Sequence, residues 1–208
     1  SEPCDVDFSE LCADGGLPTL PANISESEIS SYICVMPGTV LRDLYDNFGQ
    51  RLLESNVRTF LQFRGKVNQG MKSTLLQNPE NFFAYNNGLT VTASNIELEE
   101  KSGKLLIKKL NNMQIVNGGQ TTSAIYFSPL SKGKQQGIDF RDIDLTKVYV
   151  QMKLTVIEND EDSEIIKSNV ARYANSQNAI QAADLISNHP LHREIEKQSR
   201  SLWAPASE

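Results

Sequence analysis

Short apolar runs alternate with helix-spaced apolar positions along most of the chain. Residues 31–36 and 148–157 are rich in β-branched, aromatic and long aliphatic residues, a composition that predicts two strands. Apolar residues recur three or four positions apart from Leu41 to Phe48, which predicts a helix that ends at Gly49. Strands and helices in this mixed order predict an α/β fold, in which a mixed sheet is flanked by helices.

The most distinctive pattern lies in the middle of the chain. An apolar run stops abruptly at Asn117-Gly118-Gly119 and a helix-compatible pattern follows, so residues 114–125 predict a strand, a glycine turn and a helix N-terminus. Adjacent glycines permit positive φ, and the free amides of a helix N-terminus favour an anion. A Walker loop is not predicted, because its lysine and its spacing are both missing. The predicted ligand-binding residues of this stretch are Asn117, Gly118, Gly119, Gln120, Thr121 and Thr122. The alternative is that the glycines serve the geometry of the turn alone.

A second turn signal, Asn86-Asn87-Gly88, joins an aromatic cluster at residues 82–85 to an alternating strand at residues 89–92. In one interpretation it is a tight turn beside packed aromatic rings. In the other, the two side-chain amides present donors and acceptors at the edge of a binding site. A hairpin predicted around Lys101-Ser102-Gly103-Lys104 then leads into the central strand.

The net charge of −6 is concentrated at the N-terminus. Residues 1–30 contain seven acidic residues and no Lys or Arg, so the remaining 19 acidic and 20 basic residues nearly balance. Because this segment also contains Gly15-Gly16, Pro18 and Pro21, we predict an acidic linker or approach segment over residues 1–30. One α/β domain then follows over residues 31–208, and we expect it to be a fragment of a longer protein.

Two further windows contain polar groups suited to a ligand. Residues 51–72 carry a local charge of +4, and their arginines stand beside amides and an aromatic ring, an arrangement that suits phosphate or base contacts. Residues 172–180 form an amide-rich break between two predicted helices. The ligand-binding residues predicted in these windows are Arg58, Arg64, Asn68, Asn175 and Gln177. The alternatives are a solvated surface with one structural ion pair for the first window, and helix capping for the second.

Evidence for catalytic or metal chemistry is weak in the sequence. The acidic run at residues 160–164 is better explained as the charged start of a helix than as a metal cluster, and His189 and His192 have no marked third ligand. We therefore predict no metal site, and the sequence identifies no cofactor. Cys4, Cys12 and Cys34 form no metal-type pair and are odd in number, which favours a reducing cytoplasm. No apolar run is long enough to span a membrane, so we predict no membrane contact.

Three short motifs, two of which contain the predicted Asn-Gly turns, together resemble a known family. Asn56-Val57-Arg58, Phe82-Phe83-Ala84-Tyr85-Asn86-Asn87-Gly88 and Ile115-Val116-Asn117-Gly118-Gly119-Gln120-Thr121 resemble the AIPR family, named for abortive infection phage resistance. The resemblance covers roughly residues 32–200. It implies a bacterial cytoplasmic defence protein, and members of the family are usually longer than this chain.

A weaker likeness concerns the central turn alone. Its strand, glycine turn and helix also look like the Asp-Gly-Gln-His-Arg word of DndB-type proteins and the Gly-x-Arg-Arg phosphate box of ParB-like proteins, whose turns contact a nucleotide or nucleic acid. Here Thr121 and Thr122 stand where those families have basic residues. The likeness therefore implies phosphate binding only if Arg58 or Arg64 supplies the positive charge.

Three functions follow as hypotheses. The first is a phage-defence domain that binds a nucleotide or nucleic acid through the central turn. The second is a nuclease or nucleotide hydrolase that uses a metal or a base, with Asp160, Asp162, Glu164 or His192 as candidates. The third is an assembly module whose partner docks on the aromatic cluster at residues 82–85. The remainder of a longer chain is an expected partner in each case, and the sequence leaves the oligomeric state open.

Overall fold

The computed structural model describes residues 2–22, 29–54, 57, 68–158 and 163–176. The chain divides into two compact units, residues 1–174 and 175–208, and the first is described below by itself. Its described helices and strands are, in chain order, β1 (Val6–Asp7), α1 (Phe8–Leu11), β2 (Leu17–Pro21), β3 (Ile29–Pro37), α2 (Gly38–Phe48), η1 (Gly49–Leu52), α4 (Gln69–Gln77), η2 (Pro79–Asn81), α5 (Phe82–Tyr85), β4 (Leu89–Ala93), β5 (Asn95–Lys101), β6 (Lys104–Asn111), β7 (Gln114–Asn117), α6 (Gly119–Phe127), β8 (Lys134–Gln135), β9 (Ile138–Asp139), η3 (Phe140–Asp142), η4 (Leu145–Lys147), β10 (Tyr149–Ile157) and α7 (Ser163–Ser176).

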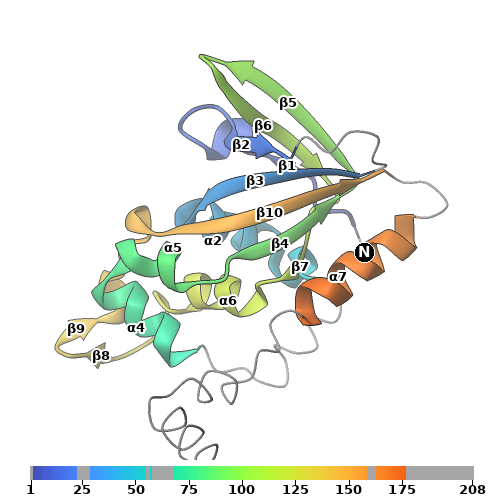
Figure 1. Cartoon of the computed structure of the whole chain (residues 1–208). Coiled ribbons are helices and arrows are strands. Elements are labelled where there is room, and N and C mark those ends of the chain that lie inside the picture. The colour runs from blue at the N-terminus through green and yellow to red at the C-terminus, as the bar shows by residue number, and fades with distance from the viewer. Residues whose placement is uncertain (1, 23–28, 55–56, 58–67, 159–162, 177–208) are drawn as a thin grey trace, which may run out of the picture. The chain divides into compact units, whose positions relative to one another are not determined.

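The sheet is mixed, as the sequence predicted. Its strand order is β1-β6-β2-β3-β10-β4-β7, with β5 paired to β6 outside this path (Figure 1). The interior strand β10 pairs antiparallel with β3 and parallel with β4, while the other neighbours run antiparallel. Helices flank this sheet, and the α/β prediction is therefore confirmed.

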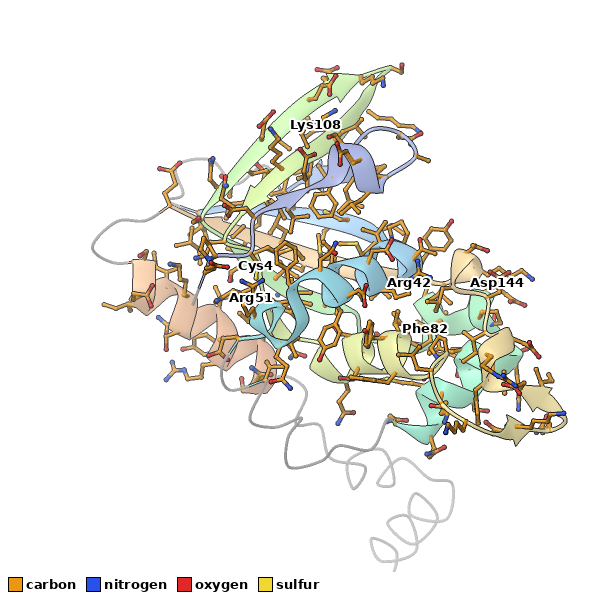
Figure 2. The ribbon with its side chains drawn as sticks, turned by 180° about the vertical axis from the view of Figure 1, so that it is seen from behind. Cys4, Arg42, Arg51, Phe82, Lys108 and Asp144 are labelled. Atoms are coloured by element: carbon orange, nitrogen blue, oxygen red, sulfur yellow. The ribbon has the colours of Figure 1, made fainter. Side chains whose placement is uncertain are left out.

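One face of the sheet forms the core. Side chains alternate along β3, where Tyr32, Cys34 and Met36 are buried and Ile33 and Val35 are exposed. Helix α2 buries its apolar face on the side of the sheet that carries the buried set, and it also packs against α6. Figure 2, seen from behind, shows α2 in front of the strands, whereas Figure 1 shows it behind them. The hydrophobic core thus lies between the sheet and the α2–α6 layer.

The N-terminal segment differs from the prediction of a linker over residues 1–30. In its described part, β1 pairs with β6, and β2 lies between β6 and β3. Val6, Phe8 and Leu17 are buried in the core. The prediction was wrong for residues 2–22, because a few well-spaced apolar side chains outweigh an acidic composition once strand partners are available. The boundary between the two units falls after Ala174 instead.

Candidate functional site

The central stretch folds as the predicted strand, glycine turn and helix. Ile115 and Val116 of β7 are buried, and Gly118 has a φ of +105° at the N-cap position of α6. A Cβ atom at Gly118 would lie 2.8 Å from the carbonyl oxygen of Gly88 and 2.5 Å from Cδ2 of Leu89. Only glycine fits here without strain, because the backbone conformation and the lack of space both exclude a side chain.

The second turn connects α5 to β4. The Asn86 side chain accepts a hydrogen bond from the amide of Gly88 at 2.8 Å, which forms an Asx turn. Gly88 has a φ of +79°, and a Cβ atom there would lie 2.3 Å from the carbonyl oxygen of Gln151 in β10. This turn is therefore packed directly against β10, an interior strand of the sheet.

The two turns form one cluster, although they are far apart in sequence. Strands β4 and β7 pair antiparallel with Thr90 opposite Asn117, which brings the start of β4 to the end of β7. The hydroxyl of Thr121 then donates a hydrogen bond to Oδ1 of Asn86 at 3.0 Å. The sequence predicted each turn separately, and the structure joins them through a side-chain bond and a close backbone approach.

The threonine hydroxyls serve the cluster itself. Thr121 and Thr122 are buried, and Oγ1 of Thr122 donates to the carbonyl oxygen of Gly118 at 3.1 Å. The first intrahelical bond joins the amide of Thr122 to the same carbonyl, so the amides of the preceding turn stand outside the helical ladder. The groups that remain for a ligand are these amides, the half-buried Gln120 and the exposed Asn87.

Asn117 makes a contact that the sequence did not indicate. Its side-chain amide donates a hydrogen bond of 2.6 Å to the carbonyl oxygen of Ala174, in the last turn of α7. The carbonyl of Gln151 and the side chain of Leu89 also shape the cluster, because they fill the space beside Gly88 and Gly118. A backbone carbonyl belongs to every residue, so no sequence signal could have identified Ala174 or Gln151.

The other predicted ligand-binding residues have varied places. Arg58, Arg64 and Gln177 lie outside the described residues. Asn68 caps α4, because its Oδ1 accepts hydrogen bonds from the amides of Gly70 at 2.9 Å and Met71 at 3.2 Å. Asn175 is exposed near the end of α7 and belongs to the second unit. Their part in a site therefore stays a prediction.

Two described cations of the basic window have local partners. Nη1 of Arg51 lies 3.0 Å from Oε2 of Glu2, and Nζ of Lys72 lies 3.7 Å from the centroid of the Phe140 ring. Figure 2 labels Arg51 at the end of the α2–η1 segment. These contacts agree with a structural use of the ends of the window, and they leave its central arginines as the remaining candidates for charge.

Candidates for metal or acid–base chemistry find little support in the described part. Glu164 pairs with Lys167 at 3.0 Å on α7, whereas Asp160, Asp162, His189 and His192 lie outside the described residues. Across residues 2–22, 29–54, 57, 68–158 and 163–176, no group of three or more His, Cys, Asp or Glu side chains could hold a metal ion.

A hollow of about 490 Å³ lies elsewhere, in the loop that contains β8, β9 and η3. Its lining residues are Lys134, Gly137, Asp139, Arg141 and Asp142. Arg141 is paired with Asp139 through contacts of 2.9 and 2.7 Å, and this pairing lowers the pKa of the Asp139 carboxyl. Since its arginine is already paired with a carboxylate and the hollow is open to solvent, we consider the turn cluster the better candidate site.

The mixed sheet with its helices defines an α/β domain. Its candidate site is a cluster of two turns, lined by neutral amides, at the N-terminus of α6. The family model described as AIPR protein matches residues 53–207. The chain therefore belongs to the AIPR family, whose name refers to abortive infection and phage resistance, as the resemblance of its turn words implied. No curated protein and no solved structure matches the chain significantly, so the weaker likeness to DndB-type and ParB-like cores stays a prediction. Among the described helices, none combines the length and the apolar character needed to cross a membrane.

Proposed function

We propose that this AIPR domain serves phage defence by binding a phosphate-bearing ligand, a nucleotide or nucleic acid, at the turn cluster formed by residues 86–88 and 117–122. The observation that carries the proposal is the joining of two Asn-Gly turns around the N-terminus of α6. The bond between Thr121 and Asn86 and the close approach of Gly118 to Gly88 fix this N-terminus in place before any ligand arrives. A preorganised site binds with a smaller loss of conformational freedom.

The chemistry of the cluster suits an anion held by neutral donors. The first-turn amides of α6 carry the positive end of the helix dipole, and Asn87, which follows the Asn86 that is bonded to Thr121, is exposed. The buried hydroxyls of Thr121 and Thr122 are already used, so in this proposal they position the backbone and do not contact phosphate. Arg58 or Arg64 supplies the compensating charge in this proposal.

An exposed aromatic group favours a nucleotide over a bare phosphate. Tyr85, which directly precedes Asn86, is 72% exposed, and Phe83, three residues before Asn86, is 42% exposed. An exposed ring next to an anion site offers a surface on which a base stacks, a contact worth about 1–3 kcal/mol per base. The same exposure also suits the assembly hypothesis, in which a protein partner docks on these rings.

The test is a titration of the protein with ATP, inorganic phosphate and a short single-stranded DNA at two salt concentrations. Binding should weaken as salt rises from about 50 to about 200 mM, because phosphate contacts release counterions. Absent or salt-insensitive binding would contradict the phosphate proposal. Binding of a protein partner, lost in Tyr85→Ala, with no nucleotide binding would favour the assembly hypothesis instead.

The variant Gln120→Glu tests ligand binding separately from the stability of the fold. A carboxylate in the first turn of α6 should leave stability unchanged or raise it by up to about 1 kcal/mol, because it complements the helix dipole. The same carboxylate should weaken binding of a phosphate ligand by about ten-fold or more, through like-charge repulsion. Gln50→Glu, at an exposed position of η1, makes the same change in net charge and should leave binding unaltered. Equal affinities for the two variants would argue against this location.

A further inference from the structure

The last turn of α7 already occupies part of the turn cluster. The carbonyl oxygen of Ala174 accepts the 2.6 Å hydrogen bond from the side-chain amide of Asn117, the residue just before Gly118. A backbone carbonyl oxygen carries a partial negative charge, and this one already accepts a side-chain hydrogen of Asn117. An internal acceptor with partial negative charge thus engages the side-chain donor that stands directly before the N-cap glycine of α6.

Little buried surface holds α7 in this position. Of its fourteen residues, only Ser163 and Ala171 are buried. Ile165 is 61% exposed and Tyr173 is 57% exposed, so part of its apolar surface faces solvent. Most helical stability in proteins comes from packing an apolar face, and a helix with this little burial is released more easily than α2 or α6.

We propose that residues 163–174 of α7 act as an autoinhibitory latch, in which the carbonyl oxygen of Ala174 competes with an anionic ligand for the side-chain amide of Asn117 beside the N-terminus of α6. This inference rests on the proposed function of the turn cluster. In the latched form the side-chain amide of Asn117 is engaged by Ala174, whereas an anion bound at the α6 amides would compete for this donor and repel the Ala174 carbonyl oxygen. Binding and release are therefore coupled, and the observed affinity is the intrinsic affinity multiplied by the fraction of molecules that are unlatched.

The first test follows hydrogen–deuterium exchange of the full chain with and without ATP. Saturating ATP should speed exchange in peptides that cover residues 163–174, because the latch is released when the ligand binds. Unchanged or slower exchange in these peptides, at ATP concentrations that saturate the site, would overturn the latch.

The second test loosens α7 without touching the turn cluster. Ala171→Gln places a larger polar side chain at a buried position of α7, whereas Asn169→Gln makes a matched change at an exposed position of the same helix. We expect Ala171→Gln to speed exchange in residues 163–174 without ligand and to tighten ATP binding by about five-fold or more, and Asn169→Gln to change neither. Faster exchange in Ala171→Gln with unchanged or weaker ATP binding would overturn the proposal.

These outcomes keep the two proposals apart. If ATP, inorganic phosphate and single-stranded DNA all fail to bind both the natural chain and Ala171→Gln, the proposed function of the turn cluster fails, and the latch fails with it. If ligand binds both proteins equally, only the latch fails. Binding to Ala171→Gln that exceeds binding to the natural chain supports both.

Discussion

The turn cluster and the tip of the β5–β6 hairpin are both glycine turns, yet they differ in what surrounds the glycine. Gly88, Gly118 and Gly103 all have positive φ, with values of +79°, +105° and +75°. A Cβ atom at Gly88 or Gly118 would lie within 3 Å of a backbone oxygen, while at Gly103 it would meet no atom within 4 Å. The hairpin tip needs glycine for its conformation, and the turn cluster needs it for conformation and for space.

The two kinds of turn differ in whether nearby or distant residues determine them, and this difference bears on where a site can form. The Ser102-Gly103 turn is determined locally, since its two strands are adjacent in sequence and its neighbours Lys101 and Lys104 are exposed. The Asn86–Gly88 turn depends on Gln151 and Thr121, which come much later in the chain. A turn that is packed by distant segments is rigid before ligand binding, and for this reason we place the proposed site there.

The largest expected effect comes from Gly88→Ala. The added methyl group would overlap the carbonyl oxygen of Gln151 at 2.3 Å, and alanine also disfavours a φ of +79°. Since this oxygen belongs to the backbone of β10, which is paired on both sides, the overlap cannot be relieved by moving a flexible side chain. We expect the free energy of unfolding to fall by about 3 kcal/mol or more. Urea denaturation measures this loss, and a cost below 1 kcal/mol, roughly that of a positive φ alone, would contradict the packed-turn interpretation.

A smaller effect is expected from Thr121→Val, which removes the hydroxyl but keeps the shape of the side chain. In this variant Oδ1 of Asn86 no longer accepts the hydrogen bond from residue 121 and keeps the one from the amide of Gly88. The free energy of unfolding should therefore fall by about 1 kcal/mol. A double-mutant cycle with Asn86→Ala measures the link between the turns, and we expect a coupling energy of about 0.5 kcal/mol or more. Additive costs would mean that the two turns are independent.

Much of the fold could be predicted from local patterns. The strand at residues 148–157 became β10, and the strand, turn and helix at residues 114–125 became β7 and α6, because periodicity and turn residues determine such elements locally. Residues 2–22 were mispredicted, since their acidic composition hides the burial of Phe8 and Leu17 between distant strands.

The candidate site was predictable in its parts and not in its assembly. Asn-Gly words identify turns at residues 86–88 and 117–119 because asparagine and glycine suit turn geometry. Their contact depends on the pairing of β4 with β7, and the burial of the Thr121 hydroxyl depends on that contact. Pairing between distant strands is a property of the whole sheet, so the sequence pattern could not show that the hydroxyl points inward.

The smallest expected effect distinguishes two reasons for a glycine, its positive φ and the lack of space for a side chain. Asparagine tolerates positive φ better than other residues with a Cβ atom, and Gly103 has open space around it. We therefore expect Gly103→Asn to change the free energy of unfolding by no more than about 0.5 kcal/mol. In Gly88→Asn the tolerance of asparagine for positive φ should not prevent a large loss of stability, because the Cβ atom itself would overlap the Gln151 carbonyl. Urea denaturation of Gly103→Asn and Gly88→Asn measures the two losses in free energy of unfolding. Similar losses would mean that positive φ alone explains both glycines. The turn cluster would then be no more tightly packed than a hairpin tip.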